Sequence, residues 1–134
     1  MLQAIIHYSL HFIAPALLAY VFFGRERFWS AYGVMLLSMA VDLDHLIANP
    51  IFDPHRMSIG FHPLHSYPAI AVYILFCLIP KKYFVFPWWV RALAIALVFH
   101  MITDFQDYML WTTSKIFFKK KLALFKNSCT FALE

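Results

Sequence analysis

The stretch VDLDHLIANP, residues 41–50, decides how the chain is interpreted, because it sets three ionisable side chains at the end of a long apolar run. Of the 134 residues, 63% are apolar and only 13% are charged, whereas a soluble domain is about 45–50% apolar. Ionisable residues inside a membrane segment usually face a bundle interior or water and have a partner. We therefore interpret Asp42, Asp44 and His45 as functional groups near the end of a membrane helix, which breaks at Pro50.

Outward from this stretch, the sequence divides into four apolar segments. Three have about the 20 residues that a spanning helix needs or more, and the third segment is short for a span. They are expected at about residues 2–23, 28–47, 67–80 and 84–111. The short turn at residues 24–27 predicts that the first two helices are antiparallel, and the Pro-containing stretch 48–66 predicts a structured loop. The predicted fold is an all-α integral membrane protein, a four-transmembrane-helix bundle with one structured loop between helices two and three.

The last part of the chain differs in character from the rest. Its five lysines are interleaved with apolar residues, and they are Lys115, Lys119, Lys120, Lys121 and Lys126. Such a pattern suits anionic lipid headgroups better than nucleic acid. We expect a membrane domain at residues 1–113, followed by a basic amphipathic tail at 114–134 that contacts membrane lipid.

The histidines and aspartates are distributed unevenly when the four segments are traced as alternating crossings. All of them fall toward the membrane side where the N-terminus lies. The candidate metal ligands among them are His11, Asp42, Asp44, His45, His62, His65, His100 and Asp104. Four separated segments thus predict one shared polar site.

Spacing within the helices supports this site. Residues three or four apart share a helical face, as Asp42 and His45 do, and as His100 and Asp104 do. Asp44 would point elsewhere on a regular helix, so it joins the site only if the helix loosens there or the site wraps around it. We set His7 and His55 aside as single residues, and weigh Asp107 equally as a ligand or an outer partner.

The chemistry of the donor set indicates metal binding. Cys77 lies in an apolar run and Cys129 in the basic tail, so neither a disulfide framework nor a cysteine-based zinc site is expected. Eight nitrogen and oxygen donors exceed the four of tetrahedral zinc but suit two divalent ions bridged by a carboxylate. Zinc is favoured, and manganese and iron remain open.

Two such ions would activate water and clamp a phosphoester, which predicts a hydrolase acting on a lipid or lipid-linked ester. In this hypothesis Asp44 bridges the metals or acts as base. His62 and His65 complete the ligand shell or protonate the leaving group. Arg56, in the same loop, is the candidate substrate-binding residue because it could pair with a phosphate.

The order of motifs resembles a known family. His11, DLDH at 42–45, HPLHS at 62–66 and HMITD at 100–104 together resemble the bacterial membrane-bound metal-dependent hydrolases. The similarity is greatest to a small uncharacterised branch that has DLDH, GFHPLHS and HMxTD motifs. The broader family has a wider gap between the two loop histidines. The resemblance implies metal-dependent hydrolysis by a multi-pass protein of the bacterial inner membrane.

Two other functions stay open at this point. A haem protein could use two of His7, His11 and His100 as axial ligands, but it leaves the aspartates unexplained. A metal transporter should place its binding groups near the middle of the bilayer. A homodimer is compatible with the small size of the chain, and no nucleic-acid partner is expected.

Overall fold

The computed structural model describes residues 2–49, 51 and 57–131, with side chains at all of these except 4, 115 and 117–131. The elements, in which η denotes a 3₁₀-helix, are α1 (Leu2–Leu36), η1 (Leu37–Ile47), η2 (Pro63–His65), α2 (Tyr67–Leu78), η3 (Lys81–Tyr83) and α3 (Trp88–Phe131). The described residues contain no β-strand, so the all-α prediction is confirmed. Two helical stretches, Ile5–Ile47 and Trp88–Ser114, are long and apolar enough to cross a membrane.

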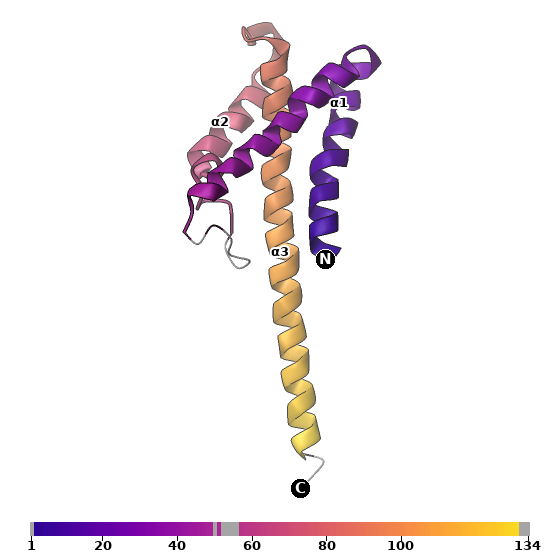
Figure 1. The fold of residues 1–134 in the computed structure, drawn as a ribbon, viewed down its shortest axis with the longest axis vertical. Helices are drawn as coiled ribbons and strands as arrows, with labels where there is room; N and C mark the ends of the chain where they lie inside the picture. The colour runs from indigo at the N-terminus through magenta and orange to yellow at the C-terminus, as the bar shows by residue number, and fades with distance from the viewer. Residues whose placement is uncertain (1, 50, 52–56, 132–134) are drawn as a thin grey trace.

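The chain reverses direction within α1, at Gly24. This residue has φ 69° and ψ 179°, a combination that is essentially restricted to glycine. Figure 1 shows the two arms of α1 meeting at this point and running back toward the N-terminal end. The hydroxyl of Tyr32 on the second arm donates a hydrogen bond to the carbonyl of Phe12 on the first. The turn expected at residues 24–27 is therefore confirmed.

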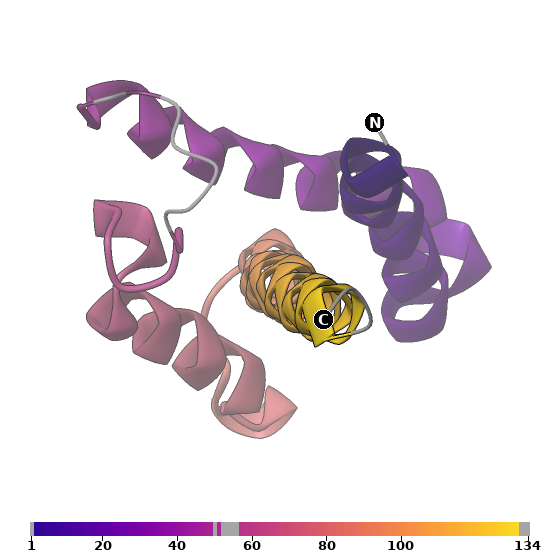
Figure 2. The same ribbon diagram turned by 90° about the horizontal axis from the view of Figure 1, so that it is seen from below.

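Helix α3 lies at the centre of the arrangement, with α1 and η1 on one side and α2 on the other (Figure 2). The fully buried part of its contact with α1 consists mainly of small side chains, with larger apolar side chains packed around them. The buried cluster is Ala19, Ala31, Met35, Ala92 and Ala96. Small residues allow two helix backbones to approach closely, so this cluster fixes α3 against both arms of α1.

Four details differ from the expected helices. The second helix changes at Leu37 from an α-helix to the 3₁₀-helix η1, and α2 ends at Leu78. The last helix was expected at about residues 84–111, but α3 begins at Trp88 and continues to Phe131. Its sequence contains neither proline nor glycine, so no residue in it favours a break.

The N-terminus, the end of η1 and the start of α2 all lie toward one end of the fold, away from the turn at Gly24 (Figure 1). Ser66 is the N-cap residue of α2, with Pro68 in the first turn, although the Ser66 side chain makes no capping hydrogen bond. This end of the fold therefore collects the stretches that carry the histidines and aspartates.

Candidate metal centre

Histidine and aspartate side chains from α1, η1, the η2 loop and α3 form three groups that could hold a metal ion. Within each group, one ligand atom per residue lies within 4.8 Å of every other. The groups are Asp42, His65, His100 and Asp104 (the central cluster); His7, His11 and Asp104 (the α1 cluster); and Asp44, His45 and His62 (the loop cluster).

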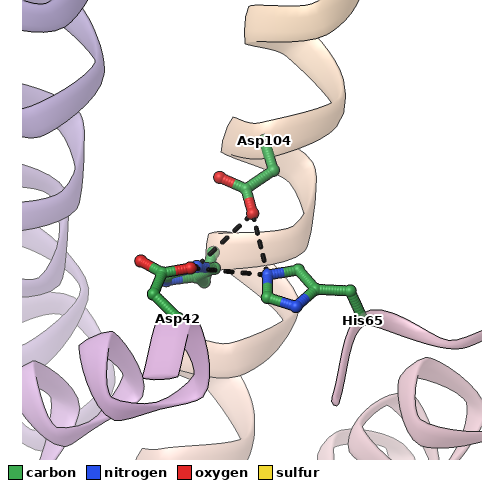
Figure 3. A group of neighbouring side chains, drawn as sticks. Asp42, His65 and Asp104 are labelled. Atoms are coloured by element: carbon green, nitrogen blue, oxygen red, sulfur yellow. Dashed lines mark hydrogen bonds and ion pairs between the residues drawn. The ribbon is translucent and has the colours of Figure 1, made fainter. Parts of the chain in front are cut away.

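The central cluster joins three elements around one point (Figure 3). Nε2 of His65 lies 3.1 Å from Oδ2 of Asp104 and 3.5 Å from Oδ1 of Asp42. Nε2 of His100 lies 3.1 Å from the same Asp42 oxygen and 3.4 Å from the same Asp104 oxygen. The side chains of both histidines are buried. Two imidazoles and two carboxylates match the donor number and types of a four-coordinate zinc site.

The α1 cluster uses the other oxygen of Asp104. Oδ1 of Asp104 lies 3.3 Å from Nε2 of His11 and 3.9 Å from Nε2 of His7. One carboxylate thus faces two clusters, as a bridging ligand would. Nε2 of His11 is buried without a hydrogen-bond partner. A buried ring nitrogen of this kind fits a metal ligand, because an unsatisfied polar atom otherwise costs free energy.

The loop cluster is connected to the central cluster through Asp44. Oδ2 of Asp44 lies 3.1 Å from Nδ1 of His65 and accepts a 2.8 Å hydrogen bond from the backbone N–H of Leu64. A metal-binding histidine usually donates its second ring N–H to such a carboxylate, which fixes the ring orientation. Asp44 therefore positions His65, while Nδ1 of His45 lies 3.2 Å from its other oxygen, Oδ1.

The 3₁₀ geometry of η1 explains how both aspartates enter the site. In a 3₁₀-helix, residues three apart are eclipsed. Ser38, Val41 and Asp44 accordingly form its buried row, and Asp42 and His45 form a second row. The helix was expected to loosen for Asp44 to take part; it tightens into a 3₁₀-helix instead, and the site also wraps around η1.

The surroundings of His65 favour positive charge. Burial alone would lower the pKa of its imidazole, but hydrogen bonds with the carboxylates of Asp104, Asp42 and Asp44 outweigh burial and raise this pKa to about 10. In the metal-free protein a proton therefore occupies the position between the carboxylates that a metal cation would take. Metal binding would release that proton.

The eight residues expected as metal ligands all lie in these three clusters. His7 also belongs to one, although it had been set aside; its spacing of four residues from His11 was the available signal. Asp107 accepts a 2.9 Å hydrogen bond from Gln3 and lies 3.8 Å from Nδ1 of His7, so it is an outer partner. The carboxylate of Asp104 belongs to two of the clusters. Asp44, expected to bridge the metals or act as base, contacts His65 of the central cluster and His45 of the loop cluster.

Some expected residues lie outside the part of the chain that the structure describes. Arg56, the candidate phosphate partner, is one of them, and so is His55. The side chains of the five tail lysines also lie outside it, although the α3 backbone is described through Phe131.

Comparison with other proteins gives a family but no function. No curated protein and no solved structure matches the chain. Residues 1–111 match the model of a family described as "Family of unknown function (DUF6122)". The matched range contains every residue of the three clusters and excludes most of the C-terminal half of α3. The chain therefore belongs to the DUF6122 family.

Proposed function

We propose that this protein is a metal-dependent membrane hydrolase that acts on a lipid or lipid-linked phosphoester. The observation that carries the proposal is the position of Asp104, whose two carboxylate oxygens face separate clusters of histidines. This arrangement supports a pair of divalent ions, with zinc favoured by the histidine and carboxylate donors. Two bound ions would supply an activated water and would stabilise charge on both oxygens of a phosphoester.

The membrane location rests on the outer surface of the fold. Apolar side chains such as Leu17, Val21 and Leu75 are more than half exposed, and they belong to a larger set on all three α-helices. An exposed apolar surface of this extent is unusual in a soluble monomer. We infer that both arms of α1, together with α2 and α3, form a four-helix bundle in the bacterial inner membrane.

The residues of the clusters have different proposed roles. His65, His100 and Asp104 are the buried ligands. Asp44 orients His65 through Nδ1, the ring nitrogen that does not face the central cluster. The side chains of Asp42 and His45 are about one-third exposed, at 33% and 30%. The open side of the site therefore lies at η1, and we place the phosphate of the substrate there.

The place of the site suits a lipid substrate. The clusters lie toward the end of the fold where the N-terminus, the end of η1 and the start of α2 meet (Figure 1). A phosphate at this end, with its acyl chains in the bilayer, could approach sideways without leaving the membrane. A soluble phosphoester would have to enter a largely apolar fold.

The geometry disfavours the two rival functions. The rings of His11 and His100 lie with their centroids 4.2 Å apart, and the carboxylate of Asp104 adjoins both. This packing leaves no flat slot between the rings for a haem. A transporter needs access from both membrane faces, whereas the described donor groups gather toward one end of the fold.

Metal analysis of the purified protein is the first test. We expect about two equivalents of a divalent transition metal per chain, and less than about half an equivalent would refute the metal centre. Asp42→Ala and His100→Ala should each lower the metal content, since each removes a ligand from the central cluster.

Activity needs a separate assay, because bound metal does not establish turnover. The purified protein should release phosphate or a phosphorylated headgroup from a panel of lipid phosphoesters. A chelator should abolish this release, and Asp42→Ala should reduce it. Full metal occupancy without hydrolysis of any lipid phosphoester would refute the hydrolase and leave a metal-binding protein.

A further inference from the structure

A large cavity lies near the other end of the fold, close to the turn at Gly24. Its volume is about 770 Å³, and all three α-helices and the segment around η3 contribute to its walls. This volume is within the usual range for small-molecule sites, about 300–1,000 Å³. The metal clusters contribute no residue to its lining.

The lining of the cavity is basic. Arg27, Lys81 and Arg91 line it, and no carboxylate does so among the residues described there. In the described part of the chain, none of these three cations forms an ion pair. Arg91 donates a hydrogen bond through Nη2 to the carbonyl of Ile79, but its Nε is buried and has no partner. The cavity therefore offers positive charge and a free buried donor to an anion.

The remaining walls are apolar and largely aromatic. Phe84 lies under the guanidinium of Arg91, which is 4.4 Å from the ring centroid, and Trp88 lies under that of Arg27 at 5.5 Å. Farther along α3, Ile95 and Val98 continue the apolar lining away from the cations. A ligand that fits must carry an anionic head and an apolar chain.

We propose that this cavity is a binding site for an anionic phospholipid. The phosphate would lie against Arg27, Lys81 and Arg91, because guanidinium groups bind phosphate oxygens in a bidentate manner. The acyl chain would lie along the aromatic residues toward Ile95 and Val98. Turns at the ends of membrane helices meet the headgroup layer, where an anionic lipid would present its phosphate. The site shares the membrane location of the proposed hydrolase, and no residue that lines it belongs to the metal clusters.

Cys77 provides a direct probe because it is a free, partly exposed cysteine that lines the cavity. In a Cys129→Ser background, the protein is placed in nanodiscs of phosphatidylcholine, with or without phosphatidylglycerol, and alkylation of Cys77 by a maleimide is timed. Protection scales as 1 + [L]/Kd, so phosphatidylglycerol should slow alkylation about tenfold when it is near nine times its Kd. Equal rates in the two lipid compositions would overturn the proposal.

Matched variants separate the site from general membrane charge. Arg27→Gln and Lys81→Gln together should remove most of the protection, since both residues line the cavity. Arg25→Gln and Lys82→Gln together remove the same charge from neighbouring positions that do not line it, and should leave the protection unchanged. Equal loss of protection in the two double variants would show a nonspecific surface effect and would overturn the proposal.

Two further measurements complete the test. Inorganic phosphate added to phosphatidylcholine nanodiscs should not slow alkylation, and equal protection by phosphate would show a site for a free anion rather than a lipid. Native mass spectrometry should show a phosphatidylglycerol adduct that the Arg27→Gln and Lys81→Gln double variant loses. Metal content should remain at its original level in every variant, which shows that the fold is intact and distinguishes failure here from failure of the metal centre.

Discussion

Replacing Asp104 by asparagine should weaken metal binding at two places at once. Its Oδ2 lies 3.1 Å from Nε2 of His65 in the central cluster, and its Oδ1 lies 3.3 Å from Nε2 of His11 in the α1 cluster. Loss of an outer partner of a metal ligand lowers affinity about 10–100-fold, so loss of a direct carboxylate ligand should cost at least about 100-fold. That factor corresponds to about 2.7 kcal/mol at each cluster.

The assay is metal content by elemental analysis after dialysis, followed by calorimetric titration of the metal-free protein. Asp104→Asn should retain less than about half an equivalent, whereas Asp42→Asn, which alters the central cluster alone, should retain about one. Gln106→Ala is the control, because Gln106 lies at an exposed position on the same helix and belongs to none of the three clusters. If Asp104→Asn and Asp42→Asn lost equal amounts of metal, Asp104 would not be shared between two ions.

Three more outcomes follow from the structure. The pKa of His65 is raised to about 10 from an ordinary 6.5, which stabilises the metal-free protein fully below pH 6.5 and less as the pH rises toward 10. The Tm of the metal-free protein should therefore fall between pH 6.5 and 10. A Tm that stays as constant as that of His65→Gln would contradict the charge pairing. Gly24→Ala should lower the free energy of unfolding by about 1–3 kcal/mol, because alanine strains the backbone there. Gly33→Ala should raise it by about 0.5–1 kcal/mol, because Gly33 lies in a regular helix and nothing lies within 4 Å of the added carbon. Equal effects of the two variants in denaturant titrations would exclude a backbone cause. Ala92→Leu should lower the free energy of unfolding by about 1–3 kcal/mol by overpacking, because Ala92 is fully buried. Ala71→Leu, on the exposed face of α2, should change the melting curve little. A similar loss of stability in both variants would show that Ala92 is not at a tight helix contact.

Local sequence signals predicted most of the helical layout. The reversal at Gly24 and the place of Pro68 in the first turn of α2 follow from the backbone preferences of glycine and proline. The change to a 3₁₀-helix at Leu37 has no comparable local signal, because the residues of η1 are ordinary helix residues. The tighter winding accompanies the contacts of Asp42 and Asp44 with other segments, and such contacts depend on the tertiary fold.

The membership of the site was predictable, but the roles within it were not. Spacing shows which residues share a face, and it identified the pairs on η1 and α3. It cannot show which oxygen of a carboxylate faces which neighbour, and so it could not distinguish Asp44 from Asp104 as the shared ligand. Spacing also failed to include His7 in the site. His7 becomes a candidate ligand only through Asp104, which comes from another helix.

Helix α3 carries both the lipid cavity and the metal ligands, on opposite faces of one rod. Arg91 and His100 are nine residues apart, which corresponds to two and a half helical turns, about 14 Å along the axis and half a turn around it. A rotation of α3 that draws Arg91 toward a bound phosphate must therefore swing His100 in the opposite direction by the same angle. If lipid occupancy changes the affinity for metal through this rotation, thermodynamic reciprocity requires metal to change the affinity for lipid by the same factor.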